Sequence, residues 1–162
     1  MKAKDLMITV QNFLKPDDTL RDAVTLLKVA KRGEEKVGVN GLPVLDEAGK
    51  LVGMLSMRDI LKAVHPTYMD LMDLGEFTWD GMLEEAAKKL ADKKVYALMT
   101  KDVTTTKEDS PLMDAVDHMI KSNVKRLPVI DNTGRVVGML YERDVFFAIV
   151  RAMLNENAGG EK

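Results

Sequence analysis

A hydroxyl residue and an acidic residue stand three positions apart where a predicted strand runs into a predicted helix, in Ser56-Met-Arg-Asp59. The free backbone N–H groups and positive potential of a helix N-terminus suit a phosphate group. The Ser56 hydroxyl adds a donor, and the Asp59 carboxylate can accept both hydrogens of a ribose 2′,3′-diol. The same spacing also describes a capping box, in which the two side chains only stabilise the helix start. The residues alone leave both interpretations open.

A second copy of this junction, Tyr141-Glu-Arg-Asp144, keeps the acid but replaces the small hydroxyl residue. Tyrosine is a poor N-cap, so the retained Asp144 slightly weakens an explanation by capping alone. Each copy also holds an arginine, Arg58 or Arg143, that can neutralise phosphate charge. If these junctions bind a ligand, their chemistry favours a phosphate and a ribose.

The sequence lacks other catalytic patterns. It has no cysteine, no glycine-rich phosphate loop, no zinc-protease helix and no serine-hydrolase elbow. His65 and His118 have no catalytic partners nearby in the sequence, and Asp131-Asn-Thr-Gly134 is interpreted as a turn. We therefore predict that the chain is not an enzyme and holds no metal or cofactor.

Composition excludes several classes of protein. The 162 residues carry 24 basic and 26 acidic side chains, a balance that favours neither nucleic acid nor anionic membranes. An apolar fraction of 46% suffices for a core, whereas no run approaches the roughly 20 apolar residues of a membrane span. The first residues lack the apolar stretch of a signal peptide. With the absence of cysteine, these features predict a cytoplasmic protein.

The two junctions belong to an internal repeat, because residues 43–59 (PVLDEAGKLVGMLSMRD) recur as residues 128–144 (PVIDNTGRVVGMLYERD). Earlier in each copy, Leu20-Arg-Asp-Ala-Val24 matches Leu112-Met-Asp-Ala-Val116. The offset falls from 92 to 85 positions, which places seven extra residues at 31–37. Repeats of this size bury a core only marginally alone, so we expect the copies to pack together.

Each copy follows the order strand, helix, strand, strand, helix. Apolar residues at helical spacing, turn residues and caps predict these elements. The predicted elements are a strand over 103–106, a helix capped by Ser110 ahead of Pro111, a hairpin turning at 131–134, a helix from about Glu142, and, in the first copy, a helix capped by Asp18 or Thr19, a hairpin turning at 46–49 and a helix over 57–64. Between the copies, residues 81–95 are also predicted to be helical.

The two copies resemble the CBS domain family, named after cystathionine β-synthase. The match rests on LPV-h-D-x-x-G-x-h-V-G-h-h-x-x-x-D in both copies, where h is apolar, on the preceding L-x-x-A-V helix, and on Leu98-Met-Thr-Lys-Asp-Val103. It implies a mixed α/β (α+β) fold of two βαββα CBS repeats packed with pseudo-twofold symmetry. The predicted domains are repeats at 1–65 and 96–154, a connector at 66–95 and a flexible tail at 155–162.

The resemblance also implies a function. CBS pairs form two clefts between their repeats and commonly bind AMP, ADP, ATP or S-adenosylmethionine there. They commonly form homodimers, and ligand changes the dimer's shape or its contact with an effector protein. In this family the adenine lies against a first strand and a basic residue before the LPV-like strand contacts phosphate. With the arginines above, the candidate nucleotide-binding residues are Ser56, Arg58, Asp59, Asp102, Val103, Thr104, Arg126, Tyr141, Arg143 and Asp144.

Two departures from the family motif make the copies unequal. Tyr141 stands where the motif has a small hydroxyl residue, and Gly41 stands where the second copy has Arg126. The cleft with Ser56 and Asp59 keeps the better motif, so we expect one competent site there rather than two equal ones. The alternative is a ligand-free scaffold for dimerisation or partner docking, which Tyr141 and Gly41 favour.

Overall fold

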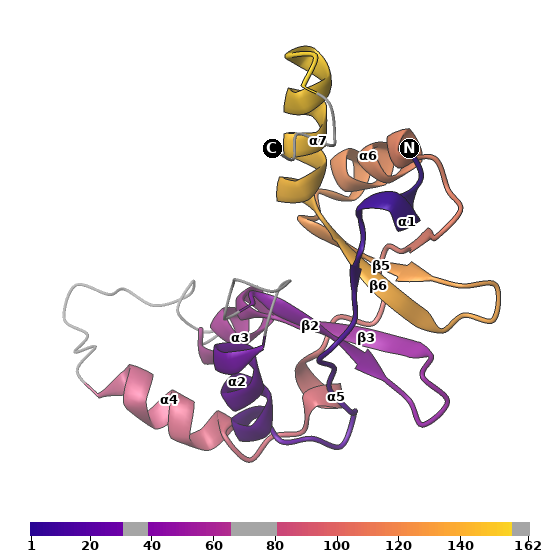
Figure 1. The fold of residues 1–162 in the computed structure, drawn as a ribbon. Helices are drawn as coiled ribbons and strands as arrows, with labels where there is room; N and C mark the ends of the chain where they lie inside the picture. The colour runs from indigo at the N-terminus through magenta and orange to yellow at the C-terminus, as the bar shows by residue number, and fades with distance from the viewer. Residues whose placement is uncertain (31–38, 66–80, 157–162) are drawn as a thin grey trace. The chain divides into compact units, whose positions relative to one another are not determined.

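The computed structural model describes residues 1–30, 39–65 and 81–156 (Figure 1). The predicted seven-residue insertion, the acidic segment 66–80 and residues 157–162 of the predicted tail lie outside the described residues. In the described part, helices and antiparallel hairpins alternate, which confirms the predicted mixed α+β fold class.

The chain divides into two compact units, which are described separately. Unit 1 consists of Met1–Val10 and Thr104–Lys162, and unit 2 consists of Gln11–Val103. The structural units therefore do not coincide with the sequence repeats predicted at 1–65 and 96–154. Residues 1–10 of the first repeat belong to unit 1, and residues 96–103 of the second repeat belong to unit 2.

Unit 1 is built on a four-stranded sheet in the order β1-β6-β5-β4. Its elements are α1 (Ala3–Leu6), β1 (Ile8–Thr9), β4 (Thr106–Lys107), α6 (Leu112–Ser122), β5 (Arg126–Ile130), β6 (Val136–Tyr141) and α7 (Glu142–Met153). Strands β5 and β6 form the predicted hairpin, whose turn residue Gly134 has a φ of 86°. The buried core comprises Ala3, Ala115, Met119, Leu127, Val129, Leu140 and Val145.

Unit 2 repeats this arrangement around the hairpin of β2 and β3. Its elements are α2 (Leu20–Val29), β2 (Gly41–Leu45), β3 (Leu51–Ser56), α3 (Met57–Val64), α4 (Met82–Leu90) and α5 (Val95–Leu98). Single bridges join Leu14 to Val44 and Thr100 to Met54 on either side of the hairpin. The core includes Leu14, Leu20, Ala23, Leu27, Val44, Leu55 and Val95. The predicted helix over 57–64 is confirmed.

The segment at the start of the chain pairs with the second repeat's hairpin. Ile8 lies opposite Met139 in the register of β1 and β6, as Thr100 lies opposite Met54 in unit 2. An exposed ion pair also holds this segment, with Lys4 Nζ 2.9 Å from Asp109 Oδ1. Their mutual hydrogen bond raises the pKa of Lys4 and lowers the pKa of Asp109. The exposed pair adds little stability, so the strand pairing and the burial of Ala3 position the segment.

Two predictions in the second repeat are wrong, and the same segment explains the first of them. Pro111, not Ser110, is the N-cap of α6, because the Ser110 carbonyl accepts a hydrogen bond from Ala3 N at 2.9 Å and Pro111 bridges Lys2. These contacts hold Pro111 outside the helix, with φ −56° and ψ 142°, and the helix begins at Leu112. The strand predicted over 103–106 is reduced to β4, because only its last residue pairs with β5.

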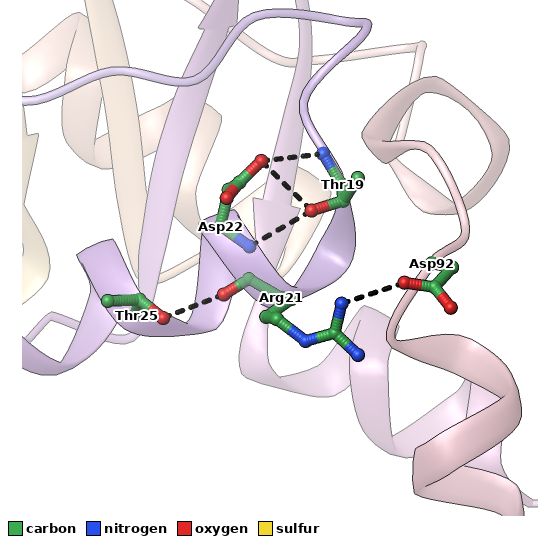
Figure 2. A network of polar contacts seen from close by, with 5 residues as sticks. All are labelled: Thr19, Arg21, Asp22, Thr25 and Asp92. Atoms are coloured by element: carbon green, nitrogen blue, oxygen red, sulfur yellow. Dashed lines mark hydrogen bonds and ion pairs between the residues drawn. The ribbon is translucent and has the colours of Figure 1, made fainter.

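The helix predicted over 81–95 ends at Leu90, and the residues after it make hydrogen bonds with the start of α2. The carbonyls of Ala91 and Lys93 accept hydrogen bonds from the backbone N–H groups of Arg21 and Leu20 in the first turn of α2. The Arg21 guanidinium also lies 2.8 Å from Asp92 Oδ1, and Figure 2 shows this ion pair. The first backbone N–H groups of a helix have no acceptor within the helix itself. The turn after α4 thus supplies acceptors for two such N–H groups of α2.

The N-terminus of α2 carries a capping box with the same residue spacing as the pair of Ser56 and Asp59. Thr19 is the N-cap, which settles the predicted choice between Asp18 and Thr19. Asp22 Oδ2 accepts hydrogen bonds from Thr19 N at 3.3 Å and Thr19 Oγ1 at 2.9 Å (Figure 2). Asp22 N donates to Thr19 Oγ1 at 3.2 Å. A hydroxyl residue three positions before an acid thus stabilises a helix start in this protein.

Candidate functional site

The junction of β3 and α3 holds Ser56 and Asp59 in the same kind of capping box. Ser56 is the N-cap, and its N and Oγ donate to Asp59 Oδ2 at 2.8 and 2.9 Å. In return, Asp59 N donates to Ser56 Oγ at 3.3 Å. Both side chains are partly buried. The capping interpretation of this pair is therefore correct as a description of the fold, and any ligand must bind to groups that already pair with each other.

Asp59 has a further partner that sequence reasoning missed. Thr100 Oγ1 donates to Asp59 Oδ1 at 2.9 Å. Two backbone hydrogen bonds with Met54, of 2.8 and 2.9 Å, hold Thr100 beside β3. The only signal in the sequence was that Thr100 belongs to the segment leading into the second repeat. Nothing local indicated that it contacts an acid 41 positions earlier.

The equivalent junction in unit 1 is built differently. Tyr141 is the N-cap of α7, and its side chain makes no capping hydrogen bond. The Asp144 side chain is partly buried, and its Oδ2 atom is fully buried without a hydrogen-bond partner in the described part of the chain. Ile8 occupies the strand position that Thr100 occupies in unit 2. The two acids therefore share a backbone position but differ in their hydrogen bonding.

The hairpin registers place the predicted basic residue next to the second junction. Arg126 lies opposite Tyr141 at the end of β5 and β6, just as Gly41 lies opposite Ser56 in unit 2. Directly opposed residues of an antiparallel pair lie on the same face of the sheet. Arg126, Tyr141 and Asp144 thus come from one end of the unit 1 hairpin and the helix start that follows it.

The two first-turn arginines are both exposed. The Arg143 guanidinium lies over the Phe147 ring one turn later, 5.4 Å from its centroid, in a cation–π contact. Arg58 has Lys62 at the corresponding position, so this contact has no counterpart in α3. The contact with Phe147 therefore restrains the Arg143 side chain at its helix start, whereas Arg58 lacks this restraint.

The candidate residues of the first strand lie between α5 and β4. Asp102 and Val103 end unit 2, and Thr104 begins the second segment of unit 1. Asp102 is exposed, whereas Val103 and Thr104 are partly buried. Thr104 Oγ1 donates to Ser122 Oγ at 3.1 Å, which ties this residue to the end of α6. In unit 2 the structure brings Ser56 and Asp59 into direct contact.

A metal centre is not found among the residues that the structure describes. Within them, no three acidic or histidine side chains gather closely enough to hold a metal ion. His118 Nδ1 lies 3.8 Å from Asp114 Oδ2 on the same helix face, a contact of helical spacing between two partly buried residues. Likewise, no described helix has the length and apolar character needed to cross a membrane.

The Ser56 cap leads to a stability prediction. Replacing Ser56 with alanine is expected to lower the free energy of unfolding by roughly 0.5–2 kcal/mol, because the cap of α3 is lost. Thr19→Ala at α2 is the matched control, since it removes the same kind of cap in the same unit. Urea denaturation of the three proteins measures the change. An unchanged stability in Ser56→Ala alone would show that this hydroxyl does not cap the helix.

Comparison with known proteins agrees with this geometry. The sequence model of the CBS domain matches residues 3–66 and 95–151. Protein MJ1426 from Methanocaldococcus jannaschii is 34% identical over 146 residues, which cover 83% of each protein.

Two solved structures with bound ligands are also similar. CBSX2 from Arabidopsis thaliana, solved in complex with AMP, is 28% identical with a TM-score of 0.67, over 94% of this chain and 98% of that one. The CBS domain pair of protein MJ0100, solved with 5′-methylthioadenosine and S-adenosyl-L-methionine, is 26% identical with a TM-score of 0.65, over 92% and 99%. With both repeats matched, the chain belongs to the CBS domain family.

Proposed function

We propose that the protein is a regulatory module that binds an adenine nucleotide, AMP, ADP or ATP, and passes the resulting change to a partner protein. The observation that carries this proposal is the repeated junction, in which Asp59 and Asp144 each occupy the first turn of a helix that directly follows a hairpin strand. The AMP-bound relative supports an adenine nucleotide as the ligand, and the MJ0100 pair supports S-adenosylmethionine as the alternative.

Each junction supplies the groups that such a ligand needs. The helix start offers backbone N–H groups and positive potential to phosphate. The carboxylate accepts ribose hydroxyls, and Arg58 or Arg143 contributes positive charge. In unit 1, Arg126 adds a second cation near the helix start. We assign the adenine to the segment of Asp102, Val103 and Thr104, as the family resemblance implies.

The regulatory effect follows from unequal binding. A ligand shifts a conformational equilibrium only as far as it binds one arrangement better than another. No catalytic step is required, and we propose that the protein itself is not an enzyme. Its output is then a change in self-association or in contact with a separate effector.

Thermal denaturation with AMP, ADP, ATP and S-adenosylmethionine tests this proposal. A ligand at about 100 times its dissociation constant stabilises the folded state by about 2.7 kcal/mol. For a chain of this length that raises the melting temperature by roughly 5–11 °C. Asp92→Ala, a change at an exposed ion pair outside the junctions, should respond like the wild type. A cooperative melt that none of the four ligands shifts would reject the proposal.

The scaffold alternative is favoured by an apolar face on α7. Phe146, Ile149 and Met153 share one side of this helix and are 56%, 40% and 75% exposed. We propose that this face mediates homodimer formation, with or without ligand.

Sedimentation velocity tests the dimer. The wild type should sediment as a dimer and Phe146→Glu as a monomer. Leu83→Glu, at a leucine of α4 that is 65% exposed, should leave the dimer intact. A dimer without any ligand response would favour the scaffold, whereas a monomeric wild type would argue against it.

A further inference from the structure

We propose that the two junctions bind ligand unequally and that the junction with Asp144 binds first. We also propose that the Thr100 hydroxyl weakens ligand binding at Asp59, because it occupies an acceptor position of that carboxylate. This inference rests on the proposed function, since it concerns the ligand of the same junctions. It reverses the expectation from the motif, in which Ser56 and Asp59 form the better site. The reason lies in the hydrogen bonds that each carboxylate already makes.

Asp59 has little acceptor capacity left. A carboxylate offers about four lone-pair positions, two on each oxygen. Oδ2 already accepts two hydrogen bonds, from the backbone N–H and the hydroxyl of Ser56. Oδ1 accepts one, from the hydroxyl of Thr100. A ribose diol brings two donors, so it can bind to both oxygens only by displacing one of these bonds.

Thr100 resists that displacement because its backbone is fixed. Its N–H and carbonyl both pair with Met54 in the middle of β3. The hydroxyl can rotate away from Asp59, but the residue itself stays beside the strand. Any ligand at Asp59 therefore competes with a partner that is held at a high local concentration.

Asp144 is in the opposite condition. Its Oδ2 atom is buried and has no hydrogen-bond partner in the described residues. A buried acceptor without a donor is unfavourable, so a ligand hydroxyl that reaches it gains more than at a satisfied acceptor. The side chain as a whole is only partly buried.

Two substitutions between the repeats cause this difference. Tyr141 replaces Ser56 and removes the capping hydroxyl, and Ile8 replaces Thr100 and removes the second hydroxyl. The first change removes the capping hydrogen bond at the helix start, and the second places an apolar side chain where unit 2 has the hydroxyl that bonds the acid. The replacement of the motif's small hydroxyl residue by Tyr141 thus leaves the Asp144 carboxylate with acceptor capacity for a ligand.

Isothermal titration calorimetry tests this order, with AMP, ADP, ATP and S-adenosylmethionine each titrated into the full chain. Asp144→Ala should weaken the tightest binding event by roughly 10- to 100-fold, the range expected for hydrogen bonds to a charged group. Asp59→Ala should leave that event unchanged. Circular dichroism melts confirm that each variant folds.

A reciprocal exchange of the two strand residues provides the matched controls. Thr100→Val removes the hydroxyl that bonds to Asp59, and it should therefore strengthen or reveal a second, weaker binding event. Ile8→Thr places a hydroxyl at the corresponding position beside β6 and should weaken the tightest event. A purely structural role of these residues would change the melting temperature without changing the two events in opposite directions.

The outcomes separate this inference from the proposed function. Loss of the tightest event in Asp59→Ala, with Asp144→Ala unaffected, overturns the inference and leaves the nucleotide-binding function in place. Equal losses in both variants also overturn it. The absence of binding heat with all four ligands overturns both.

Discussion

Replacing Leu55 with alanine is expected to lower the free energy of unfolding by about 2–5 kcal/mol, as for other fully buried leucines. Leu55 has no exposed surface and packs with Leu14, Val44 and Val95 in the core of unit 2. Its truncation removes buried apolar contacts and leaves a cavity that strands held by neighbouring hydrogen bonds cannot easily close. Denaturation in urea, followed by circular dichroism, measures the loss.

The repeat offers a matched variant in the other core. Leu140 takes the position of Leu55 in unit 1 and is also fully buried. Leu140→Ala should produce a loss of similar size, because both leucines lie at the same place in the same hairpin. Leu61→Ala, at a side chain that is 61% exposed, should change stability by no more than about 0.5 kcal/mol. If Leu61→Ala proved as damaging as Leu55→Ala, this assignment of the core would be wrong.

Gly53→Ala is expected to destabilise the protein by about 1–3 kcal/mol, the usual effect of overpacking. A Cβ atom at Gly53 would lie 2.6 Å from the Met99 sulfur and 2.9 Å from the Thr100 carbonyl oxygen. The methionine side chain can move, but the carbonyl is held by its hydrogen bond to Met54 N. The strand carrying Thr100 must therefore shift away from β3.

A double-mutant cycle distinguishes the two contacts. Met99→Ala removes the collision with sulfur but not the one with the carbonyl, so Gly53→Ala/Met99→Ala should recover only part of the loss. Gly138→Ala in unit 1 should cost less, because its added Cβ would lie 3.1 Å from the Ile8 carbonyl. Equal stability of Gly53→Ala and wild type would show that the segment of Thr100 is not held against β3.

The Gly53 variant also bears on the candidate site. Movement of Thr100 away from β3 would lengthen its hydrogen bond to Asp59 Oδ1. Thr100 thus links two features of unit 2. One is the packing of Gly53 in the hairpin, and the other is the hydrogen bonding of the Asp59 carboxylate at the helix start. A change in packing and a change in ligand binding at Asp59 are expected to accompany each other.

Much of the local structure could be predicted because it depends on neighbouring residues. The helix over 57–64, both hairpins and the cap at Thr19 follow from apolar spacing, turn glycines and side chains that bond to nearby backbone. The same holds for the Ser56 and Asp59 pair, whose members are three positions apart. The internal repeat and the family resemblance were likewise evident from the sequence.

Tertiary structure decided which hairpin each first segment joins. Strand β1 pairs with β6 and Thr100 pairs with Met54 of β3, although the two segments resemble each other and so do the two hairpins. Local patterns cannot choose between such equivalent partners, because the choice depends on contacts between distant parts of the chain. That choice places Thr100 at Asp59 and Ile8 in the corresponding position of the other unit. The difference between the two acids therefore arises from strand pairing, and not from the motif that contains them.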